Sequence, residues 1–279
     1  MRKTALIAAA AAATLALAAC GGDDGGAATA GEGSGDGITI GIKFDQPGLG
    51  LKEADGSFSG FDVDVARYVA DKLGFSEDQI TFVESVSSQR ETMIQNGQVD
   101  MIFATYSITD SRKELVDFGG PYFVAGQDLL VRADDDSISG PDGLDGKTLC
   151  SVAGSTSAQR IKDEYSAGVE LYEAQTYSEC VELLTATTVD ALTTDDIILA
   201  GFANQDAYAG ELKLVGEKFS TENYGVGIPK ESGRCDAINE AISAMIEDGS
   251  WEQALKDNAG ADYEYNTDTN PPTPGGNCS

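Results

Sequence analysis

The chain has 279 residues, enough for one large domain or two smaller ones. It carries 47 Asp and Glu against 18 Lys and Arg, a formal net charge of −29. A chain this acidic lacks the basic clusters that nucleic-acid binding requires. It has no histidine, which excludes Ser-His-Asp and Cys-His catalysis and leaves an enzyme only carboxylates, Lys or Tyr.

The first residues have the pattern of an export signal. Arg2 and Lys3 precede an apolar run over residues 5–19, which is shorter than the roughly 20 residues that span a bilayer. The following Leu17-Ala18-Ala19-Cys20 resembles the bacterial lipobox, which implies cleavage before Cys20 and a lipid on its sulfur. The alternative is ordinary signal cleavage beside an incidental cysteine. We expect a signal peptide over 1–19 and a lipid anchor on the outer face of the cell membrane.

Composition divides the rest of the chain into three parts. Residues 20–37 are rich in Gly, Ala and Asp and predict a flexible tether, whereas 263–279 are rich in Pro, Gly and Thr and predict an irregular tail. Removing Arg2 and Lys3 leaves 16 basic residues against 47 acidic ones, a net charge of −31. No other apolar run is long enough to span a membrane.

Strands and helices alternate along the first part of the folded region. Apolar residues recur every four positions from Phe61 to Leu73, as on one face of a helix. Ser88 to Glu91 has the form of a capping box that opens a second helix, which ends at Gly97. Strands are predicted at 38–42, 81–84 and 101–105. This order is typical of an α/β fold with parallel strands.

The same alternation then repeats, which predicts two lobes. Strands are expected at 128–131, 148–152 and 191–194, and near residues 171, 212 and 224. Helices are expected at 157–165, 177–184, after Asp195, and at 234–246 and 251–258, the last opened by a capping box from Ser250 to Gln253. A cleft between two such units, at the carboxyl ends of strands, is a usual site for small ligands.

Four cysteines remain after Cys20, namely Cys150, Cys180, Cys235 and Cys278. Outside the cell an even count suggests disulfides, and four cysteines allow three pairings. We favour Cys150–Cys180 and Cys235–Cys278, because each pair then stays within one region of the sequence. With no histidine and no Cys-x-x-Cys, metal binding is the weaker interpretation, and we expect no metal or cofactor.

Four segments stand out, namely Asp55 to Ala66, Ser107 to Phe118, Gly154 to Thr156 and Val189 to Asp195. Together they resemble the polar amino-acid binding proteins of ABC importers. Asp55 to Ala66 is similar to their first helix entry, and Ser107 to Arg112, followed by Val116-Asp117-Phe118, is similar to their signature loop. Gly154-Ser155-Thr156 and Val189 to Asp195 are similar to two segments of their second lobe. The matches occur in family order between Ile38 and Asn258.

The resemblance implies a two-lobed α/β fold, periplasmic-binding-protein-like and of type II. Two crossing hinge strands are expected near Leu129–Val131 and Tyr224–Ile228. The first lobe would comprise 38–130 and 226–262, and the second lobe 131–225.

The resemblance also assigns the two ends of a bound amino acid. Arg112 would hold the α-carboxylate, since Arg forms paired charged hydrogen bonds to a carboxylate. The loops of Ser107, Ser155 and Thr156, and Thr105, would assist it. Asp195 would accept the ammonium. From the residues alone, Arg112 is a surface helix residue. Asp195 is a helix N-cap, a role that is compatible with ligand binding.

Two further cations point to an acidic side chain on the ligand. Lys43 stands where relatives that bind basic amino acids have Asp, and Arg90 resembles an arginine of glutamate and aspartate binders. The alternative is that both pair with surface acids. Gln46 stands where relatives usually place an aromatic residue over the ligand.

We therefore expect a monomeric binding protein that has no catalytic residues and that delivers glutamate to an ABC permease and ATPase complex. Glutamine or aspartate are alternative ligands. A dehydratase that shares this fold, and a sensor that presents the amino acid to a receptor, are alternative functions.

Overall fold

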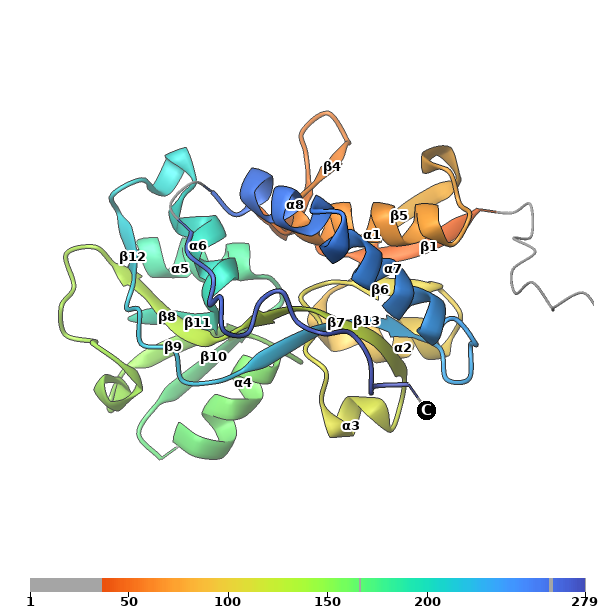
Figure 1. Ribbon diagram of the computed structural model, residues 1–279. Helices are drawn as coiled ribbons and strands as arrows, with labels where there is room; N and C mark the ends of the chain where they lie inside the picture. Colours follow the sequence, from red (N-terminus) through yellow and green to blue (C-terminus); the bar gives the residue numbers. More distant parts are fainter. Residues whose placement is uncertain (1–36, 166, 261–262, 279) are drawn as a thin grey trace, which may run out of the picture. The chain divides into compact units, whose positions relative to one another are not determined.

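Two five-stranded sheets organise the described part of the computed structural model, which comprises residues 37–165, 167–260 and 263–278 (Figure 1). The predicted signal peptide, Cys20 and nearly all of the tether lie outside these residues. The first sheet has the order β5 (Ile80–Glu84), β1 (Ile38–Ile42), β6 (Met101–Phe103), β13 (Glu222–Ile228) and β7 (Asp117–Ala125). Strands β5, β1 and β6 are parallel, as predicted, and β13 is antiparallel to β6 and β7.

The second sheet repeats this plan. Its order is β10 (Glu170–Ala174), β9 (Thr148–Val152), β11 (Ala191–Asp195), β8 (Gln127–Arg132) and β12 (Leu212–Leu214). Strands β10, β9 and β11 are parallel, and β8 is antiparallel to β11 and β12. A small antiparallel sheet of β2 (Asp45–Gln46), β3 (Gly50–Lys52) and β4 (Phe58–Ser59) lies between β1 and the first helix in the sequence. We call the first sheet, the small sheet and the helices that cover them the first lobe, and the second sheet with its covering helices the second lobe.

Helices cover both sheets. The first lobe has α1 (Phe61–Lys72), α2 (Arg90–Gln95), α3 (Asp110–Lys113), α7 (Cys235–Glu247) and α8 (Ser250–Asn258). The second lobe has α4 (Thr156–Arg160), a π-helical turn (Ile161–Tyr165), α5 (Tyr177–Thr185) and α6 (Asp196–Ala203). Short 3-10 turns lie at Glu77–Gln79, Ser87–Gln89, Pro141–Leu144 and Asp206–Tyr208. The apolar face of α1 is fully buried, and Phe61 packs edge-on against Trp251 of α8.

Neither predicted capping box forms. Helix α2 begins after Gln89, which makes no side-chain cap, and Glu91 instead bonds to the Tyr106 hydroxyl. Helix α8 is preceded by Gly249 in the left-handed region (φ 83°), so Ser250 is already its first residue. In both places the surrounding structure overrides a local sequence signal.

The chain passes between the sheets earlier than predicted. Strand β7 ends at Ala125 in the first sheet and β8 begins at Gln127 in the second, so Leu129–Val131 lies inside the second sheet. The return passage lies between β12 and β13, and Tyr224–Ile228 belongs to the first sheet. Strand β7 itself was not predicted, because Gly119, Gly120 and Pro121 interrupt it. It tolerates Pro121 because it is an edge strand.

Both favoured disulfides are present. Cys150–Cys180 joins β9 to α5, with Cα atoms 5.6 Å apart, and Cys235–Cys278 joins α7 to the tail, with Cα atoms 5.9 Å apart. The described tail residues, 263–278, contain no helix or strand, as predicted. They are nevertheless packed, because the side chain of Asn270 exchanges two hydrogen bonds with the backbone of Val124 in β7.

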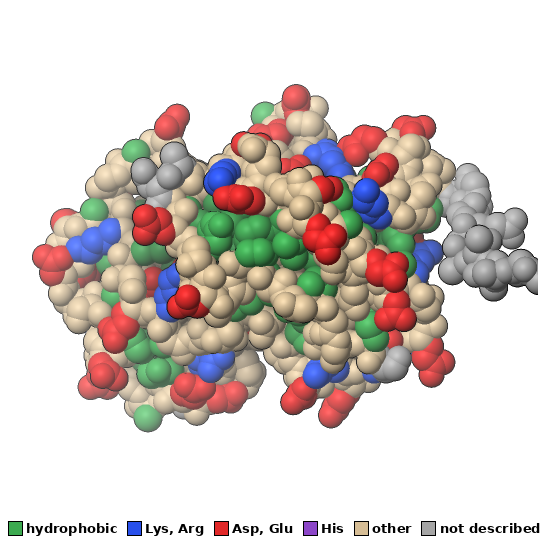
Figure 2. All heavy atoms as spheres, viewed as in Figure 1, with side chains coloured by type: hydrophobic (Ala, Val, Ile, Leu, Met, Phe, Trp, Pro, Cys, Tyr) green, Lys and Arg blue, Asp and Glu red, His purple; other side chains and the backbone are tan. Residues whose placement is uncertain are grey.

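The surface carries the acidic excess, and Asp and Glu side chains are spread over the face seen in Figure 2. Within the described ranges, no helix is long and apolar enough to cross a membrane. The same residues contain no group of three or more His, Cys, Asp and Glu side chains that could hold a metal ion.

Candidate functional site

A small cavity of about 10 Å³, room for about one water molecule, lies between the two lobes, at the carboxyl ends of strands β6, β9 and β11. It is lined by Ser87, Arg90, Thr105 and Ser107 from the first lobe, and by Ser155, Thr156, Ser157, Tyr177, Thr194, Asp195 and Ile198 from the second. Six of the eight predicted binding residues are among these. The other two, Lys43 and Arg112, lie next to it.

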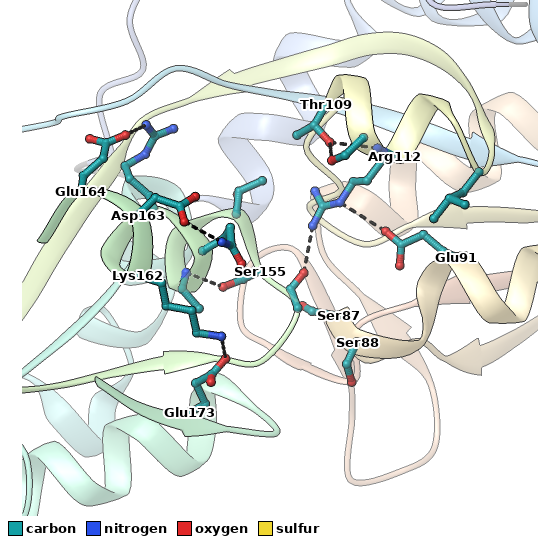
Figure 3. A pocket seen from close by; sticks show the side chains of 17 residues that line it. Ser87, Ser88, Glu91, Thr109, Arg112, Ser155, Lys162, Asp163, Glu164 and Glu173 are labelled. Carbon is teal, nitrogen blue, oxygen red and sulfur yellow. Dashed lines mark hydrogen bonds and ion pairs between the residues drawn. The ribbon is translucent and has the colours of Figure 1, made fainter. Parts of the chain in front are cut away.

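Arg112 bridges the lobes at the outer mouth of the cleft. Its Nη1 donates to the Ser107 carbonyl at 2.8 Å. Its Nη2 donates to the Gly154 carbonyl at 2.9 Å, and its Nε lies 3.2 Å from the Glu91 carboxylate (Figure 3). Only 8% of the residue is exposed, so Arg112 is not the surface helix residue of the alternative interpretation. Burial, followed by the charge of Arg90, lowers the pKa of Arg112 to about 10, so it remains charged at pH 7.

Arg90 is buried deeper, and 2% of it is exposed. Its Nη1 donates to the Ala104 carbonyl at 3.0 Å, and its guanidinium carbon lies 4.2 Å from the centre of the Tyr106 ring. The guanidinium of Arg112 lies 5.0 Å from the centre of the same ring. Cation–π contacts offset part of the cost of burying these charges. Arg90 forms no ion pair with any described residue, so it does not pair with a surface acid.

Lys43 follows β1 and is 3% exposed. Its Nζ donates to the hydroxyl of Ser87 at 2.8 Å, and Ser87 lines the cavity. Like Arg90, it forms no ion pair within the described ranges. Burial, followed by the neighbouring charge of Arg90, lowers the pKa of Lys43 to about 7.

Asp195 faces the cavity from the second lobe. One carboxylate oxygen accepts a hydrogen bond from the Tyr224 hydroxyl at 2.6 Å, and the other has no hydrogen-bond partner among the described residues, although it is buried. Asp195 occupies the N-cap position of α6 without making a side-chain cap. Burial, followed by the nearby Glu222 carboxylate, raises the pKa of Asp195 well above its usual range. A cation at the free oxygen would relieve this unfavourable burial.

The two sides of the site already touch. The hydroxyls of Ser107 and Thr156 are 3.3 Å apart, and Arg112 reaches Gly154 from the opposite lobe. In Figure 3, Arg112 and Glu91 stand on one side of the mouth, with Ser155 and Lys162 on the other.

Sequence reasoning missed Asp62, which lies in the first turn of α1. The Asp62 carboxylate accepts from the Thr105 amide at 2.8 Å and from the Tyr122 hydroxyl at 2.7 Å, and it is fully buried. It thereby holds Thr105 in the left-handed region (φ 45°), at the edge of the cavity. The spacing of Asp62 with Ala66 and Ala70, all buried, was the available signal for an inward-facing carboxylate.

Gln46 is also buried beside the site. Its side-chain oxygen accepts from the Thr105 hydroxyl at 3.3 Å, while its Nε2 has no hydrogen-bond partner among the described residues. The apolar part of the cavity wall comes from the second lobe, through Tyr177 and Ile198.

Two α/β lobes that enclose a small cavity, with basic groups on one side and a buried acid on the other, define a solute-binding protein. Residues 38–260 match the bacterial extracellular solute-binding proteins, family 3. The chain belongs to this family, and the family predicted from the four sequence segments is confirmed.

Similar proteins include the glutamate-binding protein GluB of Corynebacterium efficiens, which is 51% identical over 81% of this chain and 80% of its own length. The ABC transporter glutamine-binding protein GlnH of Bacillus subtilis is 36% identical over 79% of this chain and 80% of its own length. Among solved structures, an ancestral arginine-binding protein bound to glutamine has a TM-score of 0.74 and 34% identity. That match covers 80% of this chain and 97% of the other.

Proposed function

We propose that this chain is an extracytoplasmic lipoprotein that binds glutamate between its lobes and delivers it to an ABC importer. The observation that carries the proposal is the charge distribution of the site. Three buried cations, Lys43, Arg90 and Arg112, lie on one side, and the buried Asp195 lies on the other.

The common part of an amino acid matches Arg112 and Asp195. Arg112 would bind the α-carboxylate when its Nη2 exchanges the Gly154 carbonyl for the ligand, with the Ser107 and Thr156 loops beside it. The free oxygen of Asp195 would accept the ammonium. Each such charged hydrogen bond contributes roughly 1.5–3 kcal/mol. Because these partners come from different lobes, the ligand would favour the closed protein.

The remaining charges favour an acidic side chain. Glu91 is paired with Arg112, and the ligand ammonium would balance Asp195. Lys43 and Arg90 form no ion pair with a described residue. The Asp45 and Asp62 carboxylates act on Lys43 only as nearby charges, and both are held by backbone amides. A buried cation that lacks a direct partner is costly. The γ-carboxylate of glutamate would supply it. The neutral amide of glutamine would not, and the side chain of aspartate is one methylene shorter.

The glutamate-binding relative at 51% identity supports this choice of ligand, and the ABC transporter protein of Bacillus subtilis supports delivery to an importer. Export and lipidation rest on the signal pattern and on Cys20. Cys20→Ala should abolish incorporation of labelled fatty acid by the producing cells. Labelling that persists in this variant would contradict the anchor.

Calorimetry tests the ligand. The mature protein is unfolded and refolded to remove any carried-over ligand, and is then titrated with each of the twenty amino acids. We expect glutamate to bind with a micromolar dissociation constant or tighter, about −8 kcal/mol. Glutamine binding at least tenfold tighter than glutamate would overturn the assignment.

A further inference from the structure

Asp45 makes an unusual contact across the cleft. It lies in β2 of the first lobe, and its carboxylate accepts from the backbone amides of Tyr177 and Ser178 at 3.1 and 3.2 Å. These are the first two residues of α5 in the second lobe. The Ser178 hydroxyl also donates to the Asp45 carbonyl at 3.3 Å.

The amides that Asp45 binds are those that a helix leaves unsatisfied at its start. The side chain of Thr176, the N-cap of α5, accepts from the Glu179 amide. The amides of Tyr177 and Ser178 are left for another acceptor. A carboxylate at this end also benefits from the positive end of the helix dipole. The first lobe therefore completes the capping of a second-lobe helix.

Both partners are fixed to their own lobes. Asp45 pairs with Leu51 in the small sheet and is the third residue after β1. Helix α5 is tied to β9 by the Cys150–Cys180 disulfide. The contact therefore exists only when the lobes are together. It also places Tyr177 at the wall of the cavity.

We propose that Asp45 is a positioning residue that latches the closed form by capping α5, and so slows release of the bound amino acid. The proposal rests on the proposed function and deepens it, because the latch does not touch the ligand. In an open protein, water would solvate Asp45 and both amides. The latch thus stabilises only the closed state and raises the ratio of closed to open protein. A ligand that binds the closed state gains affinity by the factor by which this ratio rises.

Two variants isolate the hydrogen bonds from the charge. Asp45→Asn and Asp45→Ala remove the same charge, which matters because Asp45 also raises the pKa of nearby Lys43. Asn retains an acceptor oxygen and caps helices about as well as Asp, whereas Ala does not. Asp55→Ala is the matched control, since Asp55 is exposed and its side chain bonds, among the described residues, only to Ser57.

We expect Asp45→Ala to bind glutamate about tenfold more weakly than Asp45→Asn. The difference should appear in the dissociation rate measured by stopped flow, with the association rate unchanged. Hydrogen exchange at the amides of Tyr177 and Ser178 should be faster in Asp45→Ala, and the melting temperature of the ligand-free protein should be the same in all variants. Asp55→Ala should behave as the wild type.

The outcomes separate the two proposals. If the wild type binds no amino acid, the proposed function fails, and the latch, which rests on it, fails with it. If the wild type binds an amino acid, the variants test the latch alone. If Asp45→Ala and Asp45→Asn show equal dissociation rates and equal exchange at these amides, the latch is overturned. A lower melting temperature of ligand-free Asp45→Ala alone would show a purely structural role and would also overturn it.

Discussion

The ionisation of Lys43 should make glutamate binding depend on pH in a way that glutamine binding does not. In the ligand-free site the pKa of Lys43 is lowered to about 7 by burial and by Arg90. A bound γ-carboxylate would raise this pKa, since an opposite charge favours the charged form. Binding of glutamate would then be coupled to uptake of a proton.

The sign and size of the pH effect on glutamate affinity follow from this proton uptake. Because the ligand raises the pKa of Lys43, the extra affinity is fully present below pH 7 and is lost as the pH rises above it. If the pKa in the complex is near its ordinary value, affinity falls about tenfold between pH 6 and pH 8. Asp195, whose pKa is raised, also titrates when the ammonium binds. It acts on both ligands alike, so it cancels in the ratio of the glutamate and glutamine dissociation constants.

Calorimetry at pH 6, 7 and 8 measures that ratio. Buffers with different ionisation enthalpies would also count the protons taken up with each ligand. Lys43→Met, which keeps a long apolar side chain in place of the ammonium, should remove the pH dependence of the ratio. If the dissociation constants of glutamate and glutamine change with pH by the same factor in the wild type, Lys43 does not distinguish the charged side chain from the neutral one.

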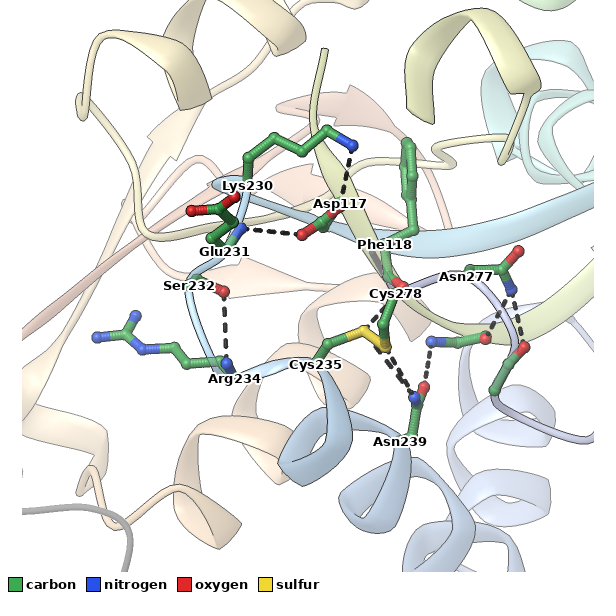
Figure 4. Close-up of a disulfide and its surroundings, with 12 residues drawn as sticks. Asp117, Phe118, Lys230, Glu231, Ser232, Arg234, Cys235, Asn239, Asn277 and Cys278 are labelled. Carbon is green, nitrogen blue, oxygen red and sulfur yellow. Dashed lines mark hydrogen bonds and ion pairs between the residues drawn. A yellow bond between two sulfur atoms is a disulfide. The ribbon is translucent and has the colours of Figure 1, made fainter. Parts of the chain in front are cut away.

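Three further predictions concern single parts of the structure. Arg112→Ala should weaken every amino acid at least a hundredfold, about 3 kcal/mol, and near-native affinity in calorimetry would show that its role has been misassigned. Lys43→Ala should weaken glutamate at least tenfold relative to glutamine, because it leaves a buried carboxylate unpaired, whereas equal losses would make Arg90 the reader of the γ-carboxylate. Replacing Cys235 and Cys278 (Figure 4) by Ser removes a cross-link between positions 43 residues apart. This should lower the free energy of unfolding by roughly 3–4 kcal/mol in the chain-entropy model. Urea denaturation would test this, and an unchanged midpoint and slope would contradict it.

The order of strands and helices could be predicted because periodicity is local. The stripe from Phe61 to Val69 identified α1 from its own residues. Strand β7 could not be found in this way, because Gly119, Gly120 and Pro121 oppose a strand assignment. It exists because it pairs along β13, roughly a hundred residues later in the chain. The position at which the chain passes between the sheets was predicted a few residues too late for the same reason. At Gly126 the chain leaves the first sheet and enters the second, and the hydrophobic pattern does not change at this point.

The candidate site was likewise predicted only in part from the sequence. Arg112 and Asp195 were predicted from motif resemblance, which carries information about the fold of relatives. Asp62 and Asp45 were not, because their partners, Thr105 and the start of α5, lie far away in the sequence. Whether an aspartate lies on the surface or holds a backbone amide is decided by tertiary structure alone. In a chain with 47 acidic residues, composition cannot distinguish the two.

The chain and its proposed ligand are both negatively charged. The structure explains how such a chain could still bind an anion. Screening limits the field of the surface acids to roughly 8 Å at physiological salt. Within the site, Lys43, Arg90 and Arg112 are each at most 8% exposed, and at such burial charges interact more strongly than in water. The same burial lowers the pKa of Lys43 to about 7, so the empty site does not have to hold three full positive charges. An acidic ligand would restore the charge of Lys43 as it binds. The attraction between the two charges then acts in the complex, and the ligand-free protein avoids part of the cost of burying a charged lysine.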